Sequence, residues 1–393
     1  MTAIILYFHI HQPYRIRRYT FFDIGADDRW FDDAENERIV RRVAERCYVP
    51  MNALLMRLVH RTDGAFRCAL SITGTVLEQM ERWAPKALAS FREIVDTGCV
   101  ELVSETSHHS LAFLTDPQEF REQVRAQTSR LTELFGKRPP TFRNTELLFD
   151  KDVAKAAEEL GFTAMLGEGA DHLLGWRSAH DVYRPTGCRK LRLILRDYPR
   201  SDDIAFRFAD RGWSEWPLTP AKFARRIESV PQDADHVGLF MDYETAGEHQ
   251  WAETGIFEFM ESLPEAVGTS GRFAFSTPSA VARAAKDAPR LDVPRPVSWA
   301  DAERDLSAWL GNDMQRAAHE ALYALLPGVR RDGRPATLER WRKLSASDHV
   351  YYMSTKFASD GDVHRYFSPY STPHDAFIAF MNVIDDFSRR LPK

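Results

Sequence analysis

The chain has 393 residues, of which 44% are hydrophobic and 28% are charged, a composition typical of a soluble globular protein with a large core. The net charge is -5, so the sequence has no basic excess of the kind that nucleic-acid-binding proteins show. No apolar stretch approaches the length of a transmembrane helix, and we therefore expect neither a nucleic acid nor a membrane as a partner.

Short apolar segments alternate with longer amphipathic ones over most of the chain. In chain order, the predicted strands are Ala3–Phe8, Phe66–Ile72, Val100–Val103, Thr141–Arg143, Thr163–Leu166, Leu191–Leu195, His236–Met241 and Arg272–Phe275. The helices predicted between them are Glu35–Val59, Val76–Asp96, 117–135, Lys151–Leu160, Ala221–Ser229 and Gly255–Ser262. Because strands and helices alternate, we predict an α/β protein whose parallel sheet is closed into a barrel.

The pattern changes near Pro289. Three prolines lie close together, Pro289, Pro294 and Pro296, and this stretch is typical of a linker. The segments beyond it predict helices only, and these are Ala302–Leu326, Thr337–Met353 and His374–Leu391. We therefore predict a barrel domain over residues 1–288 and a helical domain, packed on the barrel, over residues 289–393.

The first predicted strand runs into two histidines. His9 and His11 are two residues apart, so their side chains point to the same side of an extended chain. In an α/β barrel, active sites lie at the carboxyl ends of the strands. From these residues alone three interpretations stay open: zinc ligands, donors to sugar hydroxyls, or packing histidines at a strand end.

Polar and titratable residues follow four other predicted strands. They are Glu78 after the second strand, the cluster at 104–110 with His108 and His109 after the third, Glu146 after the fourth, and Asp242, Glu244, Glu248 and His249 after the strand at His236–Met241. Each block alone would also fit a capped helix start or a solvated loop. Ionised groups this dense after buried strands are costly unless they serve a site, so together they predict a polar pocket. Glycoside hydrolysis needs such a pocket, because two carboxyl groups must flank the scissile bond.

These strand-end motifs resemble those of glycoside hydrolase family 57, and most closely its α-amylase group. The matching blocks are residues 8–13, 74–78, 142–146 and 241–249, with a weaker block at 275–279, in family order. In the C-terminal part, residues 306–312 and 348–353 also look typical of the family. One departure is Ala246, where the α-amylase group usually has a bulky aromatic residue, and this is expected to widen the pocket.

The resemblance implies a (β/α)7 barrel, an incomplete TIM-like barrel, whose C-terminal helical domain completes the active-site cleft. It implies a retaining glycoside hydrolase acting on α-1,4-glucans such as glycogen, starch and maltooligosaccharides, with Glu146 as nucleophile and Asp242 as general acid/base. The substrate-binding residues that it implies are His9, His11, Glu78, Glu244 and His109. No metal and no other cofactor is expected.

Further expectations concern stacking faces and proton positions. Trp30, Trp251 and Trp309 are candidate faces for sugar rings, and Trp309 is the one that we include in the substrate site. Glu146 has to be ionised in order to attack, with Arg143 and His11 as candidate donors to its carboxylate. Asp242 has to hold a proton, so we expect its pKa to be raised by burial and by the charge of Glu146.

Three other functions stay open. A 4-α-glucanotransferase would act on the same substrates, because a sugar hydroxyl can replace water after the glycosyl-enzyme forms. A catalytically weak α-glucan-binding protein would keep the pocket without efficient turnover. A metal-dependent hydrolase would use His9, His11, His108, His109 and Asp242 around zinc, but it would leave Glu146 without a role.

The cysteines bear on the compartment. Cys47, Cys68, Cys99 and Cys188 form no CxxC pair, which fits free thiols in a reducing compartment. Residues 1–5 lack the charged region and the cleavage site of a leader peptide. We therefore expect a cytoplasmic protein whose partner is its glucan substrate, and the sequence does not indicate an oligomeric state.

Overall fold

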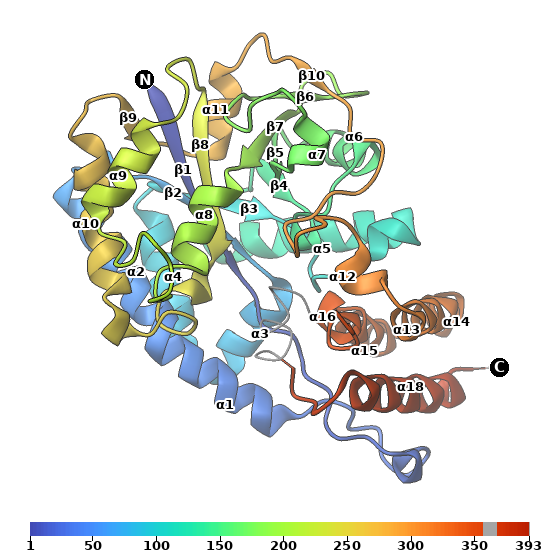
Figure 1. Cartoon of the computed structure of the whole chain (residues 1–393). Coiled ribbons are helices and arrows are strands. Elements are labelled where there is room, and N and C mark those ends of the chain that lie inside the picture. The colour runs from blue at the N-terminus through green and yellow to red at the C-terminus, as the bar shows by residue number, and fades with distance from the viewer. Residues whose placement is uncertain (357–367, 393) are drawn as a thin grey trace.

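A curved sheet of parallel strands forms the centre of the molecule, whose computed structural model describes residues 1–356 and 368–392. The strand order is β7–β5–β4–β3–β2–β1–β8 (Figure 1). These strands are β1 (Thr2–Ile10), β2 (Cys68–Ile72), β3 (Val100–Ser104), β4 (Thr141–Arg143), β5 (Ala164–Glu168), β7 (Arg192–Arg196) and β8 (His236–Asp242). A further strand, β9 (Phe273–Phe275), pairs with the first residues of β1. The predicted (β/α)7 class is confirmed.

Both faces of the sheet are covered, which explains why its strands are almost wholly apolar. In β1, Ile4 and Leu6 pack against the surrounding helices, whereas Ile5 and Tyr7 join a separate cluster inside the barrel. Since side chains alternate along a strand, His9 falls on the same inward face as Ile5 and Tyr7. The alternation that builds the core therefore also turns His9 into the barrel.

The two edge strands, β7 and β8, close the barrel without pairing as a ladder among the described residues. Single hydrogen bonds join them instead: the Asp197 amide donates to the Gly238 carbonyl at 2.8 Å, and Arg196 Nε donates to the Phe240 carbonyl at 2.9 Å. The backbones approach so closely that a Cβ on Gly238 would lie 2.3 Å from the Leu195 carbonyl oxygen. A glycine is therefore required at this seam.

Helices cover the outside of the sheet (Figure 1). They are α1 (Asp33–Val43), α2 (Val49–Arg61), α3 (Gly74–Trp83), α4 (Pro85–Asp96), α5 (Pro117–Phe135), α6 (Lys151–Glu159), α7 (Asp171–Leu174), α8 (Tyr198–Ala205), α9 (Pro220–Glu228), α10 (Ile256–Gly268) and α11 (Pro278–Ala284). The predicted limits of α5 are confirmed, since the Asp116 side chain caps it and Gly136 ends it in a left-handed conformation. The single helix predicted over Val76–Asp96 is wrong, because Pro85 starts a second helix.

A five-residue π segment, Ala44–Tyr48, joins α1 and α2 within the region predicted as one helix. Helices α8 and α11 were not predicted from the sequence. Two short strands, β6 (Arg184–Pro185) and β10 (Arg290–Leu291), form a separate parallel pair. No helix within residues 1–356 and 368–392 has both the length and the hydropathy needed to cross a lipid bilayer.

The C-terminal helices gather at the end of the barrel toward which β1 runs, in orange to red in Figure 1. They are α12 (Ser307–Leu310), α13 (Asp313–Ala324), α14 (Leu326–Asp332), α15 (Pro335–Leu344), α16 (Ser347–Tyr351) and α18 (Pro373–Arg390). Trp309 and Trp341 from these helices share one hydrophobic cluster with Phe142 and Phe149 of the barrel. The helices thus have a core in common with the barrel, and the division at residue 288 stays a prediction.

We expect Gly238→Ala to lower the free energy of unfolding by about 1–3 kcal/mol, the usual range for overpacking a tight interior. The added methyl would collide with the Leu195 carbonyl and push β7 and β8 apart. Gly268→Ala is the matched control, because nothing lies within 4 Å of its Cβ position at the end of α10. Urea unfolding of both variants tests this, and equal stabilities would show that the seam tolerates a side chain.

Candidate active site

The inward face of the sheet changes from apolar to polar at the carboxyl ends of the strands. Residues such as Tyr7, Val103 and Phe240 form the apolar interior. Two positions further along the same face, the strands or their ends place polar residues, which are His9 (β1), Glu105 (after β3), Arg143 (β4), Glu168 (β5), Arg196 (β7) and Asp242 (β8). Because side chains alternate with a period of two, these residues point into one shared space at the barrel mouth.

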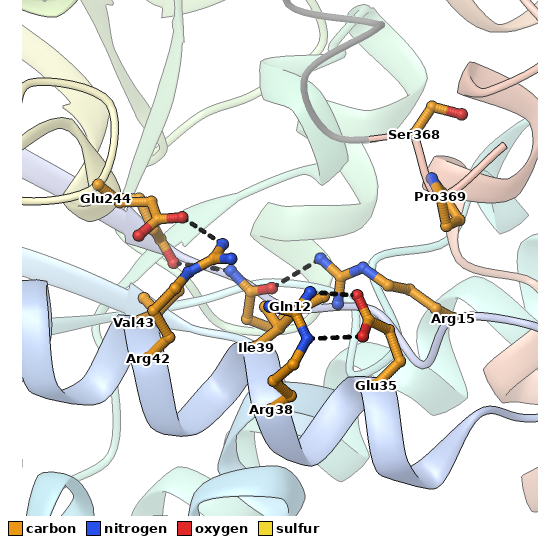
Figure 2. Close-up of a pocket in the computed structure, with 11 residues that line it drawn as sticks. Gln12, Arg15, Glu35, Arg38, Ile39, Arg42, Val43, Glu244, Ser368 and Pro369 are labelled. Atoms are coloured by element: carbon orange, nitrogen blue, oxygen red, sulfur yellow. Dashed lines mark hydrogen bonds and ion pairs between the residues drawn. The ribbon is translucent and has the colours of Figure 1, made fainter. Parts of the chain in front are cut away.

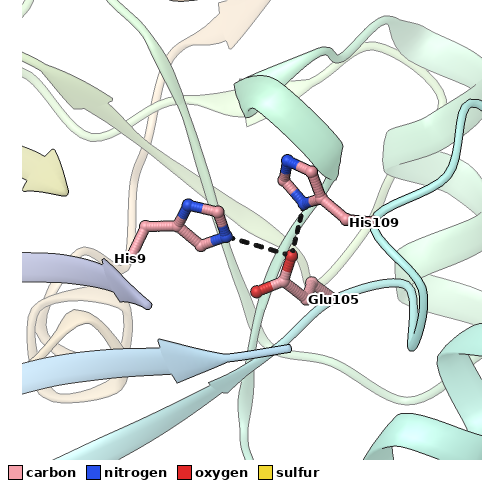
Figure 3. A group of neighbouring side chains, drawn as sticks. All are labelled: His9, Glu105 and His109. Atoms are coloured by element: carbon pink, nitrogen blue, oxygen red, sulfur yellow. Dashed lines mark hydrogen bonds and ion pairs between the residues drawn. The ribbon is translucent and has the colours of Figure 1, made fainter. Parts of the chain in front are cut away.

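Glu105 is a buried carboxylate on which His9, His109 and Arg143 converge, and Figure 3 shows it between His9 and His109. Its Oε2 accepts hydrogen bonds from His109 Nδ1 at 3.1 Å and from Arg143 Nη1 at 3.2 Å, and it lies 3.4 Å from His9 Nε2. Burial alone would raise the pKa of Glu105, but His9, Arg143 and His109 hold it well below its ordinary range. Glu105 is therefore a permanent negative charge in the wall of the site.

Glu146 is held at both of its carboxylate oxygens. Its Oε1 accepts from His109 Nε2 at 2.7 Å, and its Oε2 accepts from Trp299 Nε1 at 2.7 Å. Its backbone has a φ of +56°, a conformation that costs energy in a non-glycine residue and is often found at active sites. Burial opposes ionisation, but the hydrogen bond and charge of His109, the charge of Arg143 and the hydrogen bond from Trp299 lower the pKa of Glu146.

The donors to Glu146 differ from those predicted. His109 and Trp299 are the donors, while Arg143 acts through its charge and donates to Glu105 instead. His11, the other predicted donor, bonds elsewhere. Burial would lower the pKa of His109, but its hydrogen bonds to Glu105 and Glu146 raise it to about 9. A protonated His109 thus bridges two carboxylates.

Asp242 is the more open of the two carboxyl groups, with 42% of its side chain exposed against 22% for Glu146. Its Oδ1 lies 3.4 Å from His9 Nδ1. Desolvation would raise the pKa of Asp242, but His9, then His249 and Arg143, lower it below its ordinary value. The predicted raised pKa is therefore wrong for the protein without substrate, because the interactions of Asp242 with His9, His249 and Arg143 outweigh its burial.

His11 connects the end of β1 to the C-terminal helices. Its Nε2 lies 2.9 Å from Asp348 Oδ2 on α16, and its Nδ1 lies 2.9 Å from Thr73 Oγ1. Burial and the charge of His109 lower the pKa of His11 to about 4 despite Asp348. A neutral His11 donates from Nε2, since a carboxylate only accepts, and its Nδ1 accepts from Thr73. Its ring centroid lies 4.1 Å from that of His109, so His11 belongs to the site.

Glu244 borders a cavity of about 230 Å³ (Figure 2). Its Oε1 accepts hydrogen bonds from the Tyr48 hydroxyl at 2.6 Å and from Gln12 Nε2 at 3.4 Å. Burial and the charge of Asp242 raise the pKa of Glu244 to about 7. The residues lining the cavity are Gln12, Arg15, Glu35, Arg38, Ile39, Arg42, Val43, Glu244, Glu248, Ser368 and Pro369.

The remaining predicted residues lie apart from the two carboxyl groups. Glu78 on α3 accepts from Lys343 Nζ of α15 at 2.7 Å. His108 faces Glu339 at 3.0 Å rather than Glu146. Trp309 is 1% exposed in the core shared by barrel and helices, so its prediction as a stacking face is wrong. Ala246 is also buried in a core cluster and is not part of the cavity lining.

Trp30 likewise lies in the core, at 1% exposed, whereas Trp251 is 60% exposed. The local sequence patterns do not indicate a role for Trp299. It follows Pro296 in the stretch predicted to be a linker, and no local pattern distinguishes it from other surface tryptophans. Its contact with Glu146 joins residues that are 153 positions apart.

His9, Glu105 and His109 place potential ligand atoms within 4.8 Å of one another (Figure 3). Histidine and carboxylate are zinc ligands, so the group could in principle hold a cation. However, Arg143 Nη1 lies 3.2 Å from His9 Nε2 and 3.2 Å from Glu105 Oε2, and His109 is itself protonated. Repulsion by these positive charges disfavours a metal ion, and the expected absence of a metal stays a prediction.

A parallel barrel with carboxyl groups at the ends of two strands is an arrangement suited to a glycoside hydrolase. The chain matches Glycosyl hydrolase family 57 over residues 5–294, and it belongs to this family. It is 37% identical over 397 residues to a curated protein of Methanocaldococcus jannaschii named "Putative alpha-amylase", covering 97% of this chain and 83% of that protein.

Solved structures show the same fold. The 4-alpha-glucanotransferase from Thermococcus litoralis superposes with a TM-score of 0.72 at 15% identity over 100% of this chain, which spans 61% of the length of that enzyme's chain. The alpha-amylase AmyC from Thermotoga maritima superposes with a TM-score of 0.63 at 14% identity, covering 100% of this chain and 95% of that one.

We expect His109 to stay protonated far above neutral pH. Folding raises its pKa from 6.5 to about 9, so its stabilising contribution is complete below pH 6.5 and is lost as the pH rises through 9. Histidine NMR resonances should show this titration, and Glu105→Gln should move it to lower pH. Glu339→Gln, which removes the partner of His108, is the control and should leave it unchanged. A neutral His109 at pH 7 would contradict this assignment.

Proposed function

We propose that this chain is a retaining glycoside hydrolase that cleaves α-1,4-glucans in an α-amylase-like reaction. The observation that carries the proposal is the contrast between Glu146 and Asp242. Glu146 is ionised and held by two donors, as a nucleophile must be, whereas Asp242 is open to an incoming ligand. Family membership and the 37% identical relative support an α-glucan as the substrate.

The proposed reaction has two displacements at the anomeric carbon. Glu146 attacks that carbon, and the departing glycosidic oxygen takes a proton from Asp242. The glycosyl ester that forms on Glu146 is then attacked by water, which gives its proton to Asp242 and releases Glu146. A retaining mechanism places the two carboxyl groups about 5–5.5 Å apart, whereas inversion needs about 6.5–9.5 Å. The shorter spacing is part of the proposal.

The proton on Asp242 has to be acquired on the substrate complex, since the pKa is lowered without it. A glucan lying over the exposed part of Asp242 would remove water from it and so favour its neutral form. Once Glu146 is esterified, its negative charge is lost and Asp242 again releases a proton more readily. Substrate binding and ester formation thus drive the two roles of Asp242 in turn.

The site also suggests where the sugar residues bind. We propose that His9 and His109 contact the sugar at the cleavage point, because they touch Asp242 and Glu146 respectively. Glu244 would bind a sugar residue in the cavity that it borders. His11 and Glu78 would bind the glucan where the barrel meets the C-terminal helices. The proposed cytoplasmic location rests on the free cysteines, all of which are buried.

Incubation with maltoheptaose tests the proposed activity. We expect only shorter products, which indicate hydrolysis. A ladder of longer products would instead indicate the 4-α-glucanotransferase reaction, in which a sugar hydroxyl replaces water in the second displacement. Binding without any cleavage would favour the catalytically weak glucan-binding protein, and cleavage of no α-glucan together with no binding would overturn the substrate class.

Variants of the two carboxyl groups test their roles. Glu146→Gln should lower turnover by at least about 10³-fold and leave binding largely intact, whereas Glu37→Gln, at an exposed carboxyl paired with Arg41 on α1, is the control. Asp242→Asn should spare substrates with good leaving groups, which need little protonation. Azide should rescue Glu146→Ala with inverted configuration. If azide gives the inverted product from Asp242→Ala and not from Glu146→Ala, the two roles are reversed.

A further inference from the structure

Trp299 contacts Glu146, the proposed nucleophile, from a segment that follows the barrel strands and helices in the sequence. It lies beyond the last barrel helix, yet its Nε1 donates to Glu146 Oε2 at 2.7 Å. Its backbone amide also lies 3.4 Å from the carbonyl oxygen of Glu146. The opposite oxygen, Oε1, is held by His109. Two donors on different oxygens prevent the carboxylate from rotating about its terminal bond, which a single donor would allow.

The indole ring of Trp299 lies within cation–π distance of two guanidinium groups. The Arg143 Cζ is 5.0 Å from the ring centroid, and the Arg196 Cζ is 5.8 Å from it, distances that suit cation–π attraction. Arg196 is itself fixed on β7, since it donates to Glu168 Oε2 at 3.1 Å and to Asp202 Oδ1 at 2.5 Å. The ring therefore contacts guanidinium groups whose positions are fixed by the barrel strands β4 and β7.

The loop that presents Trp299, residues 298–305, is closed on itself and tied to the barrel. The Ser298 amide donates to the Arg304 carbonyl at 3.1 Å. Arg304 Nη1 donates to Glu168 Oε2 at 3.2 Å and lies 3.4 Å from the Trp299 carbonyl oxygen. Asp301 and Arg304 have φ values of +55° and +49°, which persist only where the surroundings enforce them. Lys356 Nζ donates to Asp301 at 3.2 Å.

We propose that Trp299 positions Glu146 for nucleophilic attack, and that the loop at 298–305, anchored through Arg304 and Glu168, is the element that seats it. This inference rests on the proposed function, because it takes Glu146 as the nucleophile. With both oxygens held, a free lone pair of the carboxylate is kept in one orientation toward the anomeric carbon. The C-terminal part of the chain thereby supplies a group for the first chemical step.

The charged groups that face Glu146 determine how its pKa changes when the Trp299 donor is removed. His109 approaches from the loop after β3, Arg143 from β4, and Asp242 lies across the site at the end of β8. None of these is altered by Trp299→Phe, which removes the indole N–H and keeps an aromatic ring. Because the lost hydrogen bond favoured the carboxylate, the pKa of Glu146 should rise in this variant.

The kinetic test compares Trp299→Phe with Trp309→Phe. In the first variant kcat for maltoheptaose cleavage should fall about 10- to 100-fold, as for loss of one hydrogen bond to a charged group, while KM stays within about threefold. The acidic limb of the kcat/KM profile should move to higher pH. Trp309→Phe alters a buried indole whose Nε1 has no partner among the described residues, so it should reduce thermal stability only. Unchanged kcat and acidic limb in Trp299→Phe would overturn the proposal.

A second variant tests the proposal independently, in case Trp299→Phe does not fold. Arg304→Lys keeps the positive charge but loses the planar guanidinium, whose Nη1 bonds to both Glu168 and the Trp299 carbonyl and whose Nη2 lies 3.9 Å from Asp202 Oδ2. It should lower kcat in the same direction by a smaller factor and move the acidic limb the same way. A full-activity Arg304→Lys variant with an unmoved limb would contradict the anchoring role of the loop.

An NMR experiment tests the hydrogen bond between Trp299 and Glu146 without an activity assay. The indole N–H signal of Trp299 is assigned as the one of nine that Trp299→Phe removes. It should shift in Glu146→Gln and stay in place in Glu37→Gln. An unshifted signal overturns the positioning contact whatever the substrate proves to be. A shifted signal in a protein that cleaves no α-glucan leaves the contact standing and rejects the proposed function instead.

Discussion

The arrangement at the barrel mouth depends on one buried carboxylate, that of Glu105. It is fully buried, and a single oxygen of it accepts from His109 and Arg143 and lies near His9. Without this negative charge, the cationic His109 and Arg143 would be brought together in a region of low dielectric, at a prohibitive cost. Glu105 makes it possible for His109 to be a cation, and a cationic His109 in turn keeps Glu146 ionised.

This network of charges gives Glu146 and Asp242, the two carboxyl groups of the candidate site, different surroundings. Glu146 is tied to the buried network through His109, and its ionised form is stabilised before any ligand arrives. Asp242 touches the network only at its edge, through His9, and is more exposed. A ligand can therefore change the protonation of Asp242 much more easily than that of Glu146. In the proposed reaction, the difference between the attacking Glu146 and the proton-transferring Asp242 would arise from their positions in one network rather than from residue type.

The C-terminal helices and the loop before them contact the strand-end residues one by one. Asp348 of α16 binds His11, and Trp299 of the 298–305 loop binds Glu146. Lys343 of α15 binds Glu78, and Glu339 of the same helix binds His108. A helical region that shares its core with the barrel and holds these side chains is part of the site's construction. Its interactions fix polar groups that would otherwise be free to adopt several rotamers.

Local patterns determined much of this protein from the sequence alone. Short apolar runs between amphipathic segments predicted the strands. The period of two along a strand turns His9, Arg143 and Asp242 inward, so the position of the site followed from the order of residues along each strand. Only the tertiary structure decided which tryptophan contacts the site, because the burial of Trp309 and the contact of Trp299 with Glu146 both depend on residues from elsewhere in the chain. It also decided the lowered pKa of Asp242, which depends on charges from β1 and β4. Such contacts join residues far apart in the sequence, and no pattern within a single segment records them.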